Sequence, residues 1–124
     1  MYQRGDIVSV PFPFTDLSQT KLRPALIVSN DDVNNTTDVI VVMITSIQKA
    51  EVMSIAVSDN DVTVPLPKNS FIRCHKVATV SQTLILKTIS IANVDFVDKV
   101  ADKIRLLIGD IPPSYIVTSA QQGM

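Results

Sequence analysis

The sequence predicts a single, mainly β domain: a small, strongly curved sheet or partly open barrel, followed by a C-terminal helix. β-Branched residues dominate the first two-thirds of the chain, in short runs separated by polar, turn-forming segments. In the last third, apolar residues recur three and four positions apart, which is typical of an amphipathic helix. At 124 residues, the chain has the length of one domain with one core.

The first strand is expected over residues 6–14. Pro11 and Pro13 in this run have no amide donor, so the segment should lie at an edge or at an exit from the sheet. A polar, turn-like loop is expected at 15–21, and a second strand at 23–29.

A turn-rich connection at 30–37 leads to residues 38–46, which are almost continuously apolar. Such a run predicts a strand covered on both faces. Further strands are expected at 52–58, 62–66 and 70–81. The last of these is long for a strand, so we expect a bend or a bulge in it.

The helix is expected to begin after Asn93, a good N-cap, and to stop at Gly109. The domain then covers 1–109, and 110–124 is expected to be a partly ordered tail. The apolar stripe of the helix consists of Val94, Val97, Val100, Ala101, Ile104, Leu107 and Ile108.

Composition excludes several classes of protein. No apolar stretch approaches the roughly 20 residues that span a bilayer, and the N-terminus lacks the pattern of a signal peptide, so we expect a cytoplasmic protein with no membrane partner. Cys74 is the only cysteine, which excludes a disulfide framework. With one histidine as well, a zinc site is not supported, and we expect no metal and no cofactor.

The net charge of −1 gives no indication of nucleic-acid binding, but the distribution of charge does. No acidic residue lies between Asp61 and Asp95, and a local positive field there could attract phosphate. Alternatively, the gap is a chance arrangement of solvated lysines. The basic residues within it are Lys68, Arg73, Lys76 and Lys87.

Strand alternation sorts the polar residues by face. In 70–81, Arg73 and His75 would share a face, about 7 Å apart by strand rise. Thr45 stands at the C-terminal end of its strand, where its hydroxyl could reach the rim of a site. The same alternation places Phe71, Val77 and Thr79 on the face of Arg73.

Arg23 opens an apolar strand and is followed by proline. A residue before proline is held in an extended conformation, so the Arg23 guanidinium should project from the mouth of the sheet. Guanidinium is a planar, permanently charged group that suits phosphate. A salt bridge to Asp16, Asp31 or Asp32 is the structural alternative.

Two arginines, a histidine and a threonine without an acidic cluster fit phosphodiester chemistry that needs no metal. In RNA cleavage the 2′-hydroxyl attacks phosphorus, and the step needs a base, an acid and cations on the phosphate oxygens. His75 could be the acid or the base near neutral pH. It could equally be a surface or half-buried strand residue with no role.

These motifs resemble the PemK/MazF toxins of bacterial type II toxin–antitoxin systems. The N-terminal motifs are RGDIV at 4–8, PFPFTD at 11–16 and LRPALIVSN at 22–30. The second motif is NSFIRCHK at 69–76, with Thr79 after it, and the helix at 93–109 sits where the family has its C-terminal helix. The ordered combination is specific, although each motif alone would be weak.

The resemblance implies an SH3-like curved barrel that forms a homodimer. It implies a growth-inhibiting endoribonuclease that cuts single-stranded mRNA without a metal, leaving a 2′,3′-cyclic phosphate and a 5′-hydroxyl. A cognate antitoxin protein would neutralise it by laying a largely disordered segment over the RNA groove. Binding of nucleic acid, RNA or DNA, belongs to the same expectation.

Carried over by motif, Arg23, Thr45, Arg73 and His75 are the candidate catalytic residues. Well-known members have an aspartate where this chain has His75, so the general base is either His75 or Arg23. The loop at 15–21 carries cleavage specificity in relatives and does not transfer. The candidate substrate-binding residues are Thr15, Asp16, Lys21, Ser46, Lys76 and Thr79.

Two other functions remain open at this point. The chain could be a catalytically inactive barrel that binds nucleic acid or an antitoxin, which His75 and the near-neutral charge would fit. It could also be a toxin of this fold that acts on another target, such as gyrase, through a protein interface.

Overall fold

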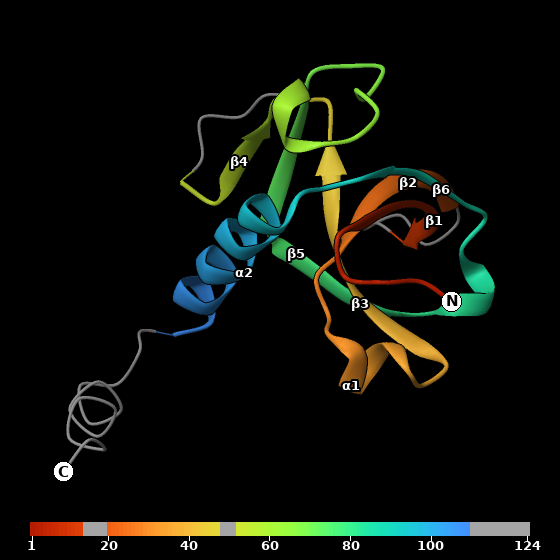
Figure 1. Ribbon diagram of the computed structural model, residues 1–124. Coiled ribbons are helices and arrows are strands. Elements are labelled where there is room, and N and C mark those ends of the chain that lie inside the picture. The colour runs from red at the N-terminus through yellow and green to blue at the C-terminus, as the bar shows by residue number, and fades with distance from the viewer. Residues whose placement is uncertain (14–19, 48–51, 110–124) are drawn as a thin grey trace, which may run out of the picture.

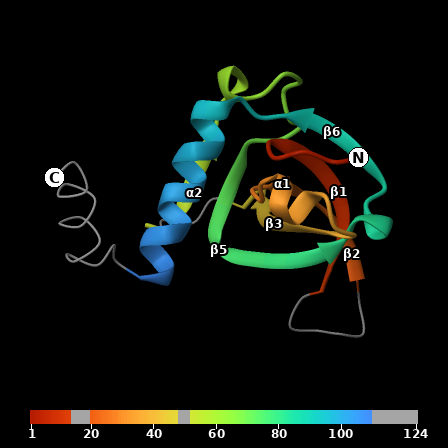
Figure 2. The ribbon, with the colours of Figure 1, turned by 60° about the horizontal axis from the view of Figure 1, so that its bottom comes forward.

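The computed structural model describes residues 1–13, 20–47 and 52–109; the expected tail at 110–124, and Thr15 and Asp16 of the expected loop, lie outside them. Within these ranges, six strands form one antiparallel sheet in the order β4-β5-β3-β2-β1-β6. Figures 1 and 2 show the sheet curled into a half-barrel with α2 beside it. The strands are β1 (Asp6–Pro13), β2 (Thr20–Ile27), β3 (Asp38–Thr45), β4 (Ser54–Val57), β5 (Ser70–Ser81) and β6 (Lys87–Ile91).

The helices are α1 (Asp31–Asn34) and α2 (Val94–Ile108), with short 3₁₀ turns at Asp59–Asp61 and Gln82–Leu84. The expected mainly β architecture with a C-terminal helix is confirmed. The placement of Pro11 and Pro13 is confirmed too: β6 pairs with Asp6–Ser9 only, so both prolines lie beyond that partner.

Four expectations about which elements the chain forms were wrong or incomplete. β2 begins at Thr20, within the loop expected at 15–21, and ends at Ile27 instead of residue 29. The connection at 30–37 holds α1, which Asn30 caps by accepting from the amide of Asp32 at 3.0 Å. Residues 62–66 form no strand, and only Val62 makes an isolated bridge, to Ala92. The strand β6 was not predicted at all.

The sheet has a separate core on each face. The first core contains the buried residues of α2 as well as residues of the sheet. The second core contains residues of β1, β2 and β3 and none of α2. β3 contributes Val42 and Ile44 to the first core and Val39, Val41 and Met43 to the second, which confirms a strand covered on both faces. Such a strand cannot slip by one residue without exchanging its two buried faces.

The expected irregularity of β5 is confirmed, and it is a sharp corner (Figure 2). Ile72 pairs with Ile44, but Val77 pairs with Val42, so four residues of β5 stand against one of β3. Ile72 belongs to the first core, whereas Ala78 packs against the second. The corner therefore exchanges the faces of the strand. The expectation that alternate residues of this strand all share one face was wrong; these residues were Phe71, Arg73, His75, Val77 and Thr79.

Asn93 caps α2 as expected, its side-chain oxygen accepting from the amide of Phe96 at 2.8 Å. The helix ends at Ile108, before Gly109. The expected stripe is confirmed in its middle, at Val97, Val100 and Ile104, where Phe96 is buried as well. It was wrong at its ends, since Val94, Leu107 and Ile108 are exposed. Among the described residues, no helix has the length and apolar character to cross a membrane.

Candidate active site

A pocket of about 360 Å³ opens where β2 begins and β3 ends. The segment between the 3₁₀ turn Asp59–Asp61 and β5 forms one wall, and β6 forms another. The pocket therefore joins four parts of the chain that are distant in sequence. Its lining residues are Leu22, Arg23, Pro24, Ile44, Thr45, Ser46, Leu66, Pro67, Lys68, Ser70, Lys87 and Ile89.

The polar lining of this pocket suits an anion. It contains three cationic side chains, Arg23, Lys68 and Lys87, and three hydroxyls, and no carboxylate among the described residues that line it. A larger groove of about 730 Å³ between α2 and β4 is different, because it mixes two lysines with Asp95, Asp98 and Asp102. Charge thus distinguishes the first pocket as the one whose lining suits an anion.

Arg23 is half-buried near the start of β2, and its Nε lies within the protein. It pairs with Val10 of β1, while Pro24 pairs with Ser9. The β2–β3 ladder runs from Ile27 to Ala25, which faces Met43. Continued in the same register, it brings Arg23 level with Thr45. Proline and strand pairing together fix the backbone at Arg23, which is one of the residues that line the pocket.

Thr45 is buried, and its Oγ1 accepts a hydrogen bond from the amide of Ile47 at 3.2 Å. A hydroxyl that accepts from an amide keeps its own proton free to donate. Ser46 follows at the exposed lip. The expected Thr-Ser pair at the end of this strand therefore does line a pocket.

The wall formed by residues 62–69 is fixed at both ends. The Ser70 hydroxyl donates to the carbonyl of Lys68 at 2.8 Å. The Ser90 hydroxyl donates to the carbonyl of Val64 at 2.8 Å and accepts from the amide of Val64 at 3.0 Å. Lys68 is therefore presented at the pocket by a backbone that is already positioned before any ligand binds.

Arg73 is half-buried on β5, with its Nε inside the protein. It pairs with Ser54 of β4. Thr45 pairs with Phe71, two positions before Arg73 and ahead of the corner, so Arg73 projects from the same face of the sheet as Thr45. Arg73 is not among the side chains that line the pocket.

Cys74, next to Arg73, is buried in the first core. Desolvation raises the pKa of its thiol from 9.0 to about 11, and the charge of Lys103 opposes this shift. The thiol thus stays protonated at neutral pH and is not a nucleophile.

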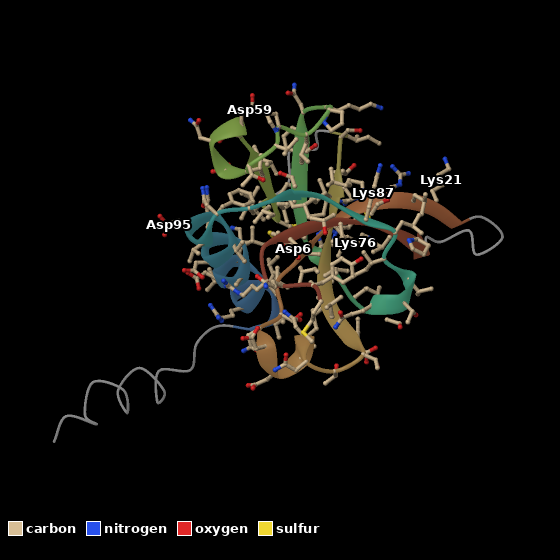
Figure 3. The ribbon with its side chains drawn as sticks, turned by 45° about the vertical axis from the view of Figure 1, so that its right-hand side comes forward. Asp6, Lys21, Asp59, Lys76, Lys87 and Asp95 are labelled. Carbon is tan, nitrogen blue, oxygen red and sulfur yellow. The ribbon has the colours of Figure 1, made fainter. Side chains whose placement is uncertain are left out.

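Four other described candidates are not among the residues that line the pocket. His75 and Lys76 are exposed in the corner of β5. Lys21, labelled in Figure 3, is exposed on β2. Thr79 pairs with Ile40, five residues along β3 from Thr45, or about 17 Å at the rise of a strand. Arg23, Thr45 and Ser46 are thus brought together in the lining of one pocket. Among the described candidates, the others are outside this lining: Lys21, Arg73, His75, Lys76 and Thr79.

Three polar residues of the pocket were absent from the predicted site: Lys68, Ser70 and Lys87. The stretch without acidic residues was the available signal, since all three lie in it. Among the described residues, no group of three His, Cys, Asp or Glu side chains is arranged to hold a metal ion.

Comparison with known protein families gives one match over most of the chain. The model of the PemK-like, MazF-like toxins of type II toxin–antitoxin systems matches residues 3–108. The resemblance seen in the sequence motifs is thereby confirmed. No curated protein sequence matches the chain closely enough to count as a relative.

Solved structures share the fold. An endoribonuclease from a mycobacterial species, in complex with its cognate antitoxin, is 18% identical, covers 91% of this chain and 100% of its own, and has a TM-score of 0.74. MazF from Deinococcus radiodurans is 20% identical, with 88% and 97% covered and a TM-score of 0.71. The Mycobacterium tuberculosis toxin MazF-mt6 is 21% identical, with 86% and 99% covered and a TM-score of 0.67. At these identities the likeness shows the fold.

Proposed function

The chain belongs to the PemK-like, MazF-like toxin family of type II toxin–antitoxin systems, and on this basis we propose that it is an endoribonuclease that cleaves single-stranded mRNA. The proposal includes independence from metal ions and products with a 2′,3′-cyclic phosphate and a 5′-hydroxyl. The observation that carries it is the pocket in which Arg23 and Thr45 meet Lys68 and Lys87.

The proposed reaction is an intramolecular transesterification, in which phosphorus exchanges its bond to the 5′-oxygen for a bond to the 2′-oxygen. The 2′-oxygen attacks phosphorus, its proton passes to a base, and the 5′-oxygen leaves with a proton from an acid. Arg23 and Arg73 would balance the charge that builds on the phosphate oxygens, and the Thr45 hydroxyl would donate to one of them. No water is consumed in this step, which is why the product is cyclic.

Arg23 and His75 remain the two candidates for proton transfer. Arg23 lines the pocket, whereas His75 stands exposed at the corner of β5, outside the lining. The pocket lining therefore supports Arg23 more than His75 as the group beside the phosphate, where a permanently charged guanidinium could act only as the proton donor. On this reading His75→Ala costs much less activity than Arg23→Ala.

The proposed partners are a cognate antitoxin protein and a second copy of the chain, in the cytoplasm. Relatives in complex with antitoxins support the first partner. The end of α2 supports the second partner, another copy of the chain, because Leu106, Leu107 and Ile108 are all exposed there. Exposed apolar clusters of this kind are commonly protein interfaces.

Cleavage of varied single-stranded RNAs in EDTA tests the proposal directly. Arg23→Ala and Arg73→Ala should each lower kcat/KM by about 100-fold or more, since each removes a charge from the phosphate. Arg105→Ala is the matched control, an exposed arginine of α2 paired with Asp102, and it should cleave like the wild type. Intact RNA in every wild-type reaction, with no effect of expression on growth, would refute the proposal.

A catalytically inactive barrel that binds nucleic acid or an antitoxin is the second candidate, and the exposed position of His75 favours it. Such a protein would bind RNA and leave it uncut. Detection of a 2′,3′-cyclic phosphate at a product end, absent with Arg23→Ala, excludes this candidate.

A further inference from the structure

Lys68 and Lys87 line the pocket although neither belongs to the motifs at 4–30 and 69–79 that define the family resemblance. We propose that these two lysines form a second phosphate subsite, which holds a phosphodiester next to the one that is cut. The inference rests on the proposed function as a ribonuclease, and it concerns the positioning of the RNA, not the chemical step.

Lys87 is placed by strand pairing. It pairs with Ser9 of β1, and Ser9 pairs on its other side with Pro24 of β2. Residues paired in this way point to one face of a sheet, so Lys87 shares the face of Pro24, two strand spacings or about 10 Å away. Figure 3 shows Lys87 on the side of the molecule away from Asp95 and α2.

Lys68 reaches the same pocket from the opposite wall. Its carbonyl is held by the Ser70 hydroxyl, and Pro67 before it restricts the backbone. The side chain is exposed, as is that of Lys87. Two flexible ammonium groups therefore face a pocket whose described lining contains no carboxylate that would pair with them.

The amount of charge indicates more than one phosphate. One phosphodiester carries one negative charge, and the proposed reaction already assigns Arg23 and Arg73 to it. Lys68 and Lys87 then provide two further positive charges in the same pocket. An ammonium on a flexible stem binds phosphate as a point charge, without reading a base, which is the property of a contact that positions a strand.

Binding of a non-cleavable probe separates this subsite from catalysis. The probe is a fluorescent 2′-O-methyl RNA oligonucleotide, titrated at several salt concentrations. Lys68→Ala and Lys87→Ala should each weaken binding and reduce the slope of log K against log salt by about 0.7, the value for one phosphate of a single strand. Lys99→Ala, an exposed lysine in the groove between α2 and β4, is the control and should leave the slope unchanged.

A scan of neutral linkages then locates the contact. Single methylphosphonates replace the phosphodiesters of the probe in turn. At the linkage that Lys87 holds, the wild type should lose affinity while Lys87→Ala loses nothing further, and Lys87→Arg should behave as the wild type. If Lys87→Ala and the wild type lost the same affinity at every substituted linkage, Lys87 would contribute only to a general positive field, and the subsite would be overturned.

Steady-state kinetics distinguish a failure of the second phosphate subsite from a failure of the proposed ribonuclease function. With cleavable RNA, Lys68→Ala and Lys87→Ala should raise KM several-fold and leave kcat nearly unchanged, because the contact is the same in the ground and transition states. If the wild type cleaves RNA and both variants have its KM and kcat, the second subsite would be overturned and the proposed function would stand. A wild type that neither binds the probe nor cuts RNA would overturn the proposed function and the subsite with it.

Discussion

Cys74 makes stability depend on pH at the alkaline end. Its thiol has a pKa of about 11 in the folded chain against 9.0 when solvated, because burial disfavours the thiolate. The unfolded chain thus loses this proton first as pH rises. The contribution of the thiol to stability is complete below pH 9 and is lost between pH 9 and 11.

Denaturant unfolding at pH 8 and pH 10.5 measures this effect. The wild type should lose about 2 kcal/mol more than Cys74→Ala between the two conditions, since one pKa unit corresponds to about 1.4 kcal/mol. Lysines and tyrosines titrate in both proteins and cancel in the difference. Equal losses in the two proteins would mean that burial of Cys74 does not set the alkaline limit.

At the level of single residues, the sequence pattern identified those pocket residues that are marked by their immediate neighbours in the chain. Arg23 is marked by the proline after it, and Thr45 by its place at the end of a buried strand; both line the pocket. Lys68 and Lys87 carry no such local mark. Their convergence depends on the pairing of β6 with β1 and on the bonds of Ser70 and Ser90, which one sequence does not reveal.

At the level of the elements, the start of α2 depends on Asn93, whose side chain makes two hydrogen bonds. Its Oδ1 caps the amide of Phe96, and its Nδ2 donates to the carbonyl of Asn60 at 3.2 Å. Asn93→Ala should lower the free energy of unfolding by about 1 kcal/mol or more, the usual cost of a lost cap.

Urea unfolding monitored by circular dichroism checks this value. Asn69→Ala is the control, an exposed asparagine in the segment before β5, and it should unfold like the wild type. Asn93→Asp keeps the capping oxygen and should recover most of the loss. If Asn93→Ala matched Asn69→Ala, the cap would contribute nothing to the stability of the domain.

Elements with a strong pattern of their own were predictable, and elements defined by their partners were not. The apolar run of β3 and the capped helix α2 are local features, and both were found. The faces of β5 were assigned wrongly because its corner is set by β3 on one side and β4 on the other. β6 was missed because its five residues are mostly exposed and show no clear alternation.

At the scale of the whole molecule, the exposed apolar end of α2 bears on assembly. Leu106, Leu107 and Ile108 have exposed fractions of 54%, 39% and 83%, and burying them between two chains would be favourable. Leu107→Lys with Ile108→Lys should shift a proposed homodimer toward the monomer. Sedimentation velocity over a range of concentrations measures the shift.

Leu84→Lys is the matched control for that experiment. Leu84 is 48% exposed in the 3₁₀ turn after β5, outside α2, and its replacement should leave the assembly unchanged. A wild type that sediments as a monomer at all concentrations would refute the homodimer. An unchanged dimer in the α2 variant would refute this location for its interface.

The strand order also has a consequence for synthesis on the ribosome. The pocket draws on residues 22–24, 44–46, 66–70 and 87–89, and the last of these belong to β6, which pairs with the first strand of the chain. A nascent chain that has emerged only to Ile85 has no β6, and one wall of the pocket is missing. The site is completed only once β6 has emerged, so a shorter nascent chain does not carry a finished pocket beside the message that encodes it.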